Sequence, residues 1–216
     1  MFRTVRPVEV ALSLALASCA GAPTPCDRAI PCEDGTSCVA GRCLSPTADP
    51  VAMETRRVVL SATAVRVLSS RGAHPRADVA TLGARREGET RVLLAFDAGL
   101  APGVRVERAF LVLSADTDAP GPSAEVELSA AAILSPWHGE SVSWGRSPSI
   151  GLALATEPVV GAPRRPLRFD VTRAFQGAER GRFGLAVLGS GADPVGVSID
   201  TRVGTTAGPR LELYLR

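Results

Sequence analysis

The chain has 216 residues, enough for one domain of ordinary size with a hydrophobic core and some additional segments. All 24 basic residues are arginine and they face 22 acidic residues, so the formal net charge is only +2. This near-neutral balance argues against a nucleic-acid partner, and the chain has no phosphate-binding loop, nucleophile elbow or zinc-protease motif.

Residues 1–18 have the features of a bacterial signal peptide. Two arginines precede a short apolar run, 10–17, which is far below the roughly 20 residues that a spanning helix needs. Leu16-Ala17-Ser18-Cys19 resembles the lipobox, in which a cysteine is lipidated and becomes the mature N-terminus. We therefore expect an exported lipoprotein, anchored to the bacterial cell envelope through Cys19; an ordinary signal peptide with an incidental cysteine is the alternative. Ala20 at the next position resembles the pattern that is sorted to the outer membrane.

A cysteine-rich segment follows the anchor. The other four cysteines of the chain fall within 18 residues, at Cys26, Cys32, Cys38 and Cys43. In an exported chain this clustering predicts two disulfides in a small knob over 19–43, with three possible connectivities. A zinc site is the rival interpretation, but two of the three spacings are longer than zinc knuckles use. Residues 44–56, with two prolines, are predicted to be a linker.

The remaining residues, 57–216, alternate apolar and polar side chains with a period of two, which predicts strands. Clear examples lie at 92–96, 126–130, 167–171, 195–199 and 211–215, whereas 109–113 is apolar on both faces. Glycine- and proline-rich turns between the segments favour an antiparallel β-sandwich or barrel. One short helix is expected at Thr172–Gln176, capped by Asp170 or Thr172 and ended by Gly177.

The aromatic residues are few, and both tryptophans lie in the stretch 135–148. Trp144 continues the phase of Val142, which predicts a strand and an indole inside the core. Trp137 comes before that phase, so two positions are open for its indole: the core, or the surface, where it could contact a ligand. Tyr214 belongs to the outward phase of the last strand and is expected to be exposed. Trp137 and Tyr214 are therefore the candidate platforms for stacking on a sugar ring.

Several short motifs of this region occur in an order that resembles one known family. They are Thr90–Asp97, Ala109–Leu113, the tryptophan-containing stretch Trp137–Pro148, Phe169–Thr172 and Pro209–Leu213. Together they look like the DNRLRE domain, also grouped as carbohydrate-binding module family ninety-six. The resemblance covers roughly 57–216 and implies a jelly-roll β-sandwich in exported proteins that act on, or attach to, polysaccharide. Gly145-Arg146 stands where the family usually has asparagine.

No pattern in the sequence indicates catalysis, a cofactor or a metal site. His74 and His138 are far apart, and Glu140 with Asp170 is a weak candidate for a glycosidase pair. The acidic run 116–118 lacks the rest of a calcium loop and is interpreted as a polar turn. We therefore expect a non-catalytic envelope lipoprotein whose sandwich binds polysaccharide. The alternative is a structural or protein-interaction module without glycan specificity; the oligomeric state is not predicted.

Overall fold

The computed structural model describes residues 26, 32, 37–39, 42–44, 55–72, 78–84, 88–100, 103–139, 141–176, 181–191 and 193–216. The predicted signal peptide, Cys19, most of the linker, His74, Glu140 and Gly177 lie outside these residues. Within the described part of the chain, no helix has the length and apolar character needed to cross a membrane.

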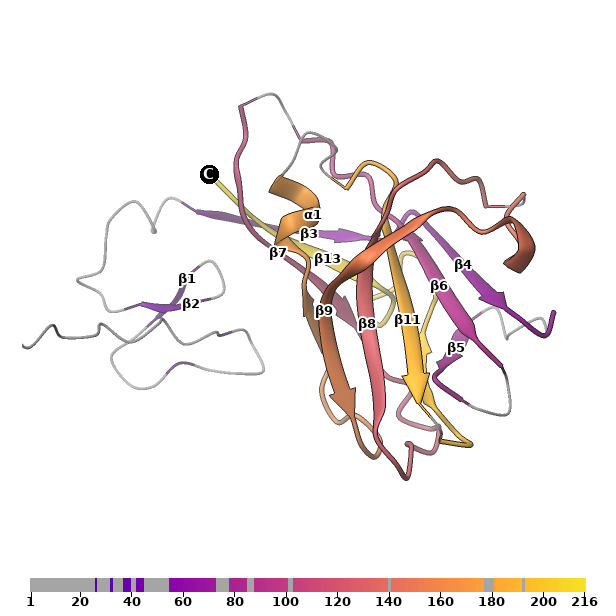
Figure 1. The fold of residues 1–216 in the computed structure, drawn as a ribbon. Helices are drawn as coiled ribbons and strands as arrows, with labels where there is room; N and C mark the ends of the chain where they lie inside the picture. The colour runs from indigo at the N-terminus through magenta and orange to yellow at the C-terminus, as the bar shows by residue number, and fades with distance from the viewer. Residues whose placement is uncertain are drawn as a thin grey trace, which may run out of the picture.

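Two antiparallel sheets form the body of the protein (Figure 1). The four-stranded sheet has the order β10-β7-β13-β3, with bounds Leu167–Asp170, Val106–Leu113, Arg210–Leu215 and Arg56–Ser61. The five-stranded sheet has the order β4-β6-β11-β8-β9, with bounds Ala64–Ser69, Thr90–Ala95, Leu185–Gly191, Val126–Ile133 and Ile150–Val159. A two-stranded sheet pairs β12, Val197–Asp200, with β5, Val79–Leu82.

The chain passes repeatedly from one sheet to the other, for example from β6 to β7 and on to β8. Its first strand in the sandwich, β3, pairs with its last strand, β13. A small hairpin of β1, Ser37–Val39, and β2, Arg42–Leu44, precedes the sandwich. These features confirm the predicted jelly-roll-like antiparallel β-sandwich, with a small cysteine-rich segment before it.

The core lies between the two sheets and is built from the inward phase of each strand. In β8, Val126, Leu128 and Ala130 are fully buried, whereas Glu127 is exposed. Phe169 of β10 is the largest of the fully buried side chains. Burial of such side chains from water is the main force holding the sheets together, at about 25 cal/mol per Å² of apolar surface.

The short helix α1, Thr172–Gln176, confirms the prediction made for it. The Asp170 carboxylate accepts a hydrogen bond from the Thr172 backbone N–H at 3.0 Å, so Asp170 satisfies one of the free N–H groups at the start of the helix. The Thr172 hydroxyl accepts a bond from the Ala109 backbone N–H at 3.0 Å, which ties α1 to β7. Phe175 on α1 packs into the main core.

The prediction that Trp144 lies in a core strand is wrong. Residues 134–149 connect β8 to β9, which are neighbours in one sheet, and the Leu134 N–H bonds the Ser149 carbonyl at 2.8 Å where the connection begins and ends. The connection packs against Leu93 and Ala186, which lie on the face of the sheet that points away from the main core. Trp144 therefore starts a short 3-10 helix, Trp144–Arg146, and its indole is only half-buried.

Candidate ligand-binding surface

The outer face of the five-stranded sheet carries a second apolar cluster, separate from the main core. Its buried members are Leu68, Leu93, Ile133 and Ala186, and partly buried side chains cover them: Trp137, Val142, Trp144, Ile150, Phe183 and Leu188. The β8–β9 connection thus folds back over this face. It explains why Leu93, on the outward phase of β6, is fully buried.

Both tryptophans are fixed on this face by polar contacts as well as by packing. The Trp137 indole N–H donates a hydrogen bond to the Phe183 carbonyl at 2.7 Å. The Arg91 guanidinium lies over the Trp144 ring, 4.2 Å from its centroid, a cation–π contact. Trp137, for which the sequence left both a core and a surface position open, is half-buried, and one face of Trp144 is occupied by Arg91. The aromatic rings therefore serve this surface mainly as packing groups.

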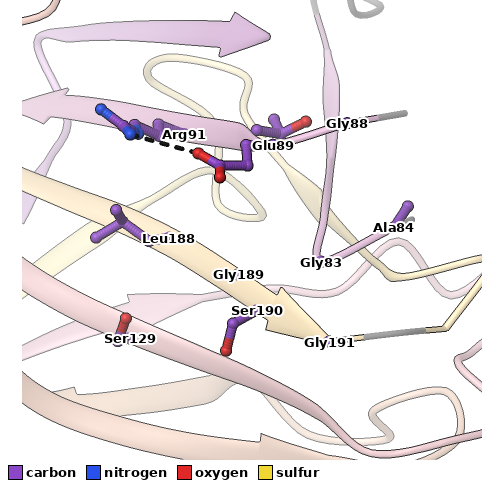
Figure 2. Close-up of a pocket in the computed structure, with 11 residues that line it drawn as sticks. Gly83, Ala84, Gly88, Glu89, Arg91, Ser129, Leu188, Gly189, Ser190 and Gly191 are labelled. Atoms are coloured by element: carbon purple, nitrogen blue, oxygen red, sulfur yellow. Dashed lines mark hydrogen bonds and ion pairs between the residues drawn. The ribbon is translucent and has the colours of Figure 1, made fainter. Parts of the chain in front are cut away.

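Arg91 also lines a pocket of about 500 Å³ beside Trp144 (Figure 2). The pocket lies between the segment that joins β5 to β6 and the end of β11, with β8 on its other side. Its lining residues are Gly83, Ala84, Gly88, Glu89, Thr90, Arg91, Ser129, Leu188, Gly189, Ser190 and Gly191. Three of them, Arg91, Leu188 and Ser129, stand opposite one another on β6, β11 and β8.

The pocket combines polar groups with a small apolar area. Glu89 and Arg91 form an ion pair with 3.5 Å between Oε2 and Nη2, and the Glu89 side chain is 72% exposed. In the described part of the structure, the Ser129 and Ser190 hydroxyls have no hydrogen-bond partner from the protein, so both are available to a ligand. Leu188 lies between them and the ion pair (Figure 2).

A glycine sets how closely the walls of the pocket approach. A Cβ on Gly189 would lie 2.5 Å from the Gly83 backbone nitrogen, well inside contact distance. Any larger residue there would push the β5–β6 segment away from β11. The pocket is thus shaped by backbone rather than by bulky side chains.

Asp193, which follows β11, holds the turn next to the pocket in place. Its carboxylate is buried and accepts bonds from the backbone N–H groups of Ala124, at 2.8 Å, and Val195, at 2.7 Å. The Ser123 N–H and hydroxyl and the Gly196 N–H add three more bonds. Bonds from Ala124 and Val195 contribute most to holding the pKa of this carboxyl far below its ordinary value, because they favour the charged form. The sequence signal for this role was only the Asp-Pro pair in a glycine-rich turn.

The prediction that Tyr214 is exposed is wrong, although its side chain does point away from the core, as expected. Tyr214 faces away from the core, on the outer side of the four-stranded sheet, but its side chain is only 6% exposed. It packs edge-on against Phe110, with ring centroids 6.0 Å apart, and stands between Arg108 and Arg57 on the neighbouring strands. Arginine stems cover apolar surface while the charged end stays near water. The ring is therefore not available to stack on a sugar.

Ion pairs occupy the rest of that outer face. Glu212 pairs with both Arg57 and Arg168, and the Arg168 guanidinium lies 3.4 Å from the Phe110 ring centroid. Arg108 pairs with Asp170 at 2.8 Å. Since Asp170 is bound to Arg108 and caps α1, its role is structural. The side chains of Glu212, Arg57, Arg168, Arg108 and Asp170 are thus paired within the protein.

The cysteine-rich segment contains a disulfide between Cys32 and Cys43. Cys26 is also disulfide-bonded, and the sulfurs of these three cysteines lie within 4.8 Å of one another. The side chain of Cys38 lies outside the described residues. Zinc binds thiolates, and a disulfide has none, so the pairing of Cys32 with Cys43 favours the disulfide interpretation over a zinc site.

The acidic run near residue 116 forms a turn, as expected. The Asp116 carboxylate accepts a bond from the Asp118 backbone N–H at 3.1 Å, the arrangement of an Asx turn. His138 is exposed in the β8–β9 connection. Neither segment contributes to the pocket.

No protein-family model matches the chain, and no curated protein matches it either.

Proposed function

We propose that this protein is a non-catalytic cell-envelope lipoprotein whose sandwich binds polysaccharide in the pocket beside Trp144. The supporting observation is the composition of the pocket: an ion pair whose carboxylate is exposed, two hydroxyls that no described residue of the protein binds, and the apolar side chain of Leu188. Binding sites of this kind combine apolar surface with a few convergent polar groups. A sugar ring presents many hydroxyls around an apolar face, so it complements both.

The resemblance to the DNRLRE domain points to the same class of ligand and remains a prediction. Neither of the two aromatic residues that were candidates for stacking on a sugar, Trp137 and Tyr214, is retained in this role. Tyr214 is buried on the opposite sheet, and Trp137 has its N–H bonded to the protein. We therefore assign the contacts with sugar to the pocket, with Trp144 as the support that holds Arg91 in position.

Filling the pocket should abolish polysaccharide binding. A Ser129→Leu, Ser190→Leu double variant removes both free hydroxyls and occupies the space between them with apolar groups. We expect its affinity for the bound polysaccharide to fall at least about tenfold, which is about 1.4 kcal/mol. Affinity gel electrophoresis against a panel of soluble polysaccharides measures this as lost retardation. Ser61→Leu, at an exposed strand position in the other sheet, is the matched control and should migrate like the native protein.

We propose that Cys19 carries the lipid anchor, because a lipobox-like motif follows two arginines and a short apolar run. One acyl chain binds a membrane only marginally, so several chains are needed for stable attachment. Cys19→Ser should move the protein from the membrane fraction to the soluble fraction and remove the mass of the acyl groups. Unchanged fractionation and unchanged mass would show that the anchor assignment is wrong.

One observation favours the alternative, a protein-interaction module. β9 is a ten-residue edge strand, and its Leu152 side chain is 92% exposed. Exposed edge strands invite pairing with another chain. Pro158 lacks an N–H and Glu157 is charged, so the second half of β9 resists such pairing; burial raises the pKa of Glu157. If no polysaccharide in the panel retards the protein, glycan binding is ruled out for this panel and the protein-interaction module becomes the favoured function.

A further inference from the structure

The cysteine-rich segment contains a second disulfide whose partner can be narrowed to two residues. The chain has five cysteines, at positions 19, 26, 32, 38 and 43. Cys32 is bonded to Cys43, and Cys26 is disulfide-bonded as well. A disulfide within this single chain therefore joins Cys26 to Cys19 or to Cys38, whose side chains both lie outside the described residues.

The backbone of the β1–β2 hairpin favours Cys38 as the partner. In the pairing of the two strands, Cys38 lies directly opposite Cys43. The α-carbons of such opposite residues are about 4.5 or 5.5 Å apart, and both residues lie on the same face of the hairpin. The Sγ atoms of Cys43 and Cys26 lie within 4.8 Å of each other, and Cys26 is buried. The backbone of β1 therefore holds Cys38 close to the sulfur of Cys26, as a disulfide requires.

The other cysteine, Cys19, is accounted for by the lipid anchor, and this step rests on the proposed function. The sulfur of a lipidated cysteine forms a thioether with the diacylglyceryl group, so it has no thiol left for a disulfide. With Cys19 used in this way, the other four cysteines form two pairs among themselves. An odd cysteine in an exported chain has a separate role on this assignment.

We infer that Cys26 is bonded to Cys38 and that this disulfide crosses the one between Cys32 and Cys43. The bond forms when the two thiols lose two protons and two electrons to the disulfide of an oxidised dithiol carrier, by thiol–disulfide exchange. Each strand of the hairpin is then tied to the segment before it, β1 through Cys38 and β2 through Cys43. The two disulfides close the segment between anchor and sandwich into one covalent unit, in the place of a hydrophobic core.

Peptide mapping without reduction tests this connectivity in the full mature chain. Unpaired thiols are first blocked with N-ethylmaleimide in denaturant at mildly acidic pH, where few thiolates remain to exchange disulfides. Trypsin and the endoprotease Glu-C then cleave after Arg28, Glu33 and Arg42, which puts each of the four cysteines on its own peptide. Mass spectrometry should find two linked pairs, one that joins the Cys26 and Cys38 peptides and one that joins the other two.

Two double variants with the same number of substitutions provide the matched control. Cys26→Ser, Cys38→Ser removes both ends of the inferred bond, so it should keep the other linked pair and leave no thiol of the segment to be blocked. Cys26→Ser, Cys43→Ser removes one end of each bond, so it should lose both linked pairs.

The failure of the inference can be told apart from the failure of the proposed anchor. A blocked Cys38 in the native chain, or Cys38 linked to any cysteine other than Cys26, would overturn the inference alone if Cys19 carries lipid. A disulfide between Cys19 and Cys26, within one peptide, would overturn both. Linked Cys26 and Cys38 peptides together with a Cys19 that carries no lipid would support the inference and overturn the anchor.

Discussion

Gly184→Ala is expected to destabilise the sandwich by about 2–6 kcal/mol, the sum of a strained backbone conformation and a steric overlap. Gly184 has a φ of +91°, which L side chains rarely adopt, and an added Cβ would overlap the Leu94 carbonyl oxygen of β6. The residue cannot shift freely, because its carbonyl accepts a bond from the Ile133 N–H and its own N–H donates to the Gly181 carbonyl. The overlap therefore falls on the backbone of a neighbouring strand.

Gly103→Ala separates these two contributions. Gly103 has nearly the same φ, +89°, but no atom of the described residues lies within 4 Å of the position of an added Cβ. Its substitution should cost only the backbone term, about 1–2 kcal/mol. Urea unfolding of both variants measures the difference. Equal losses of stability would mean that β6 and β11 yield to the extra methyl group and that their spacing is not set by glycine.

Phe169→Ala should cost about 3–5 kcal/mol, because truncating a fully buried aromatic side chain removes its transfer free energy and leaves a cavity. Phe169 is 0% exposed and belongs to the main core between the sheets. Against a net stability of about 5–15 kcal/mol, the loss threatens folding itself. In a domain of 150–250 residues, each 1 kcal/mol lowers the melting temperature by about 2–4 °C.

Phe183→Ala provides the comparison for this prediction. Phe183 is half-buried in the outer-face cluster, so its truncation removes less surface from contact and opens a site that solvent can fill. Its loss of stability in thermal and urea unfolding should be clearly smaller than that of Phe169→Ala. If the two variants melt together, the outer-face cluster contributes to stability as much as the space between the sheets does.

The sequence by itself determined the strand character and the interior of the sandwich. The alternation of Val126, Leu128 and Ala130 with acidic neighbours places one face of β8 inside, since successive side chains of a strand point to opposite faces. The helix Thr172–Gln176 could also be predicted from the sequence, because the residue that caps it, Asp170, lies only two positions before its start. The alternation of a strand and the cap of a helix each involve residues that are close together in the sequence, so neither depends on the tertiary structure.

Only the tertiary structure decided what covers the outward faces. Tyr214 was correctly assigned to the outward phase, but its burial depends on Phe110 and on arginines from two other strands. Trp144 shares the spacing of a strand residue, yet it lies in a connection between two paired strands and packs on the outer face of the sheet. An alternating pattern predicts on which face of the sheet a side chain lies. It does not predict whether other residues cover that face.

The candidate pocket was likewise beyond the reach of the sequence. Arg91, Leu188 and Ser129 are separated by tens of residues along the chain and meet only because β6, β11 and β8 are paired in one register. A shift of one residue in that register would turn each of these side chains to the other face. Strand pairing between distant segments is set by the packing of the whole sandwich, and it is this pairing that brings the Arg91 guanidinium and the Ser129 and Ser190 hydroxyls to one place.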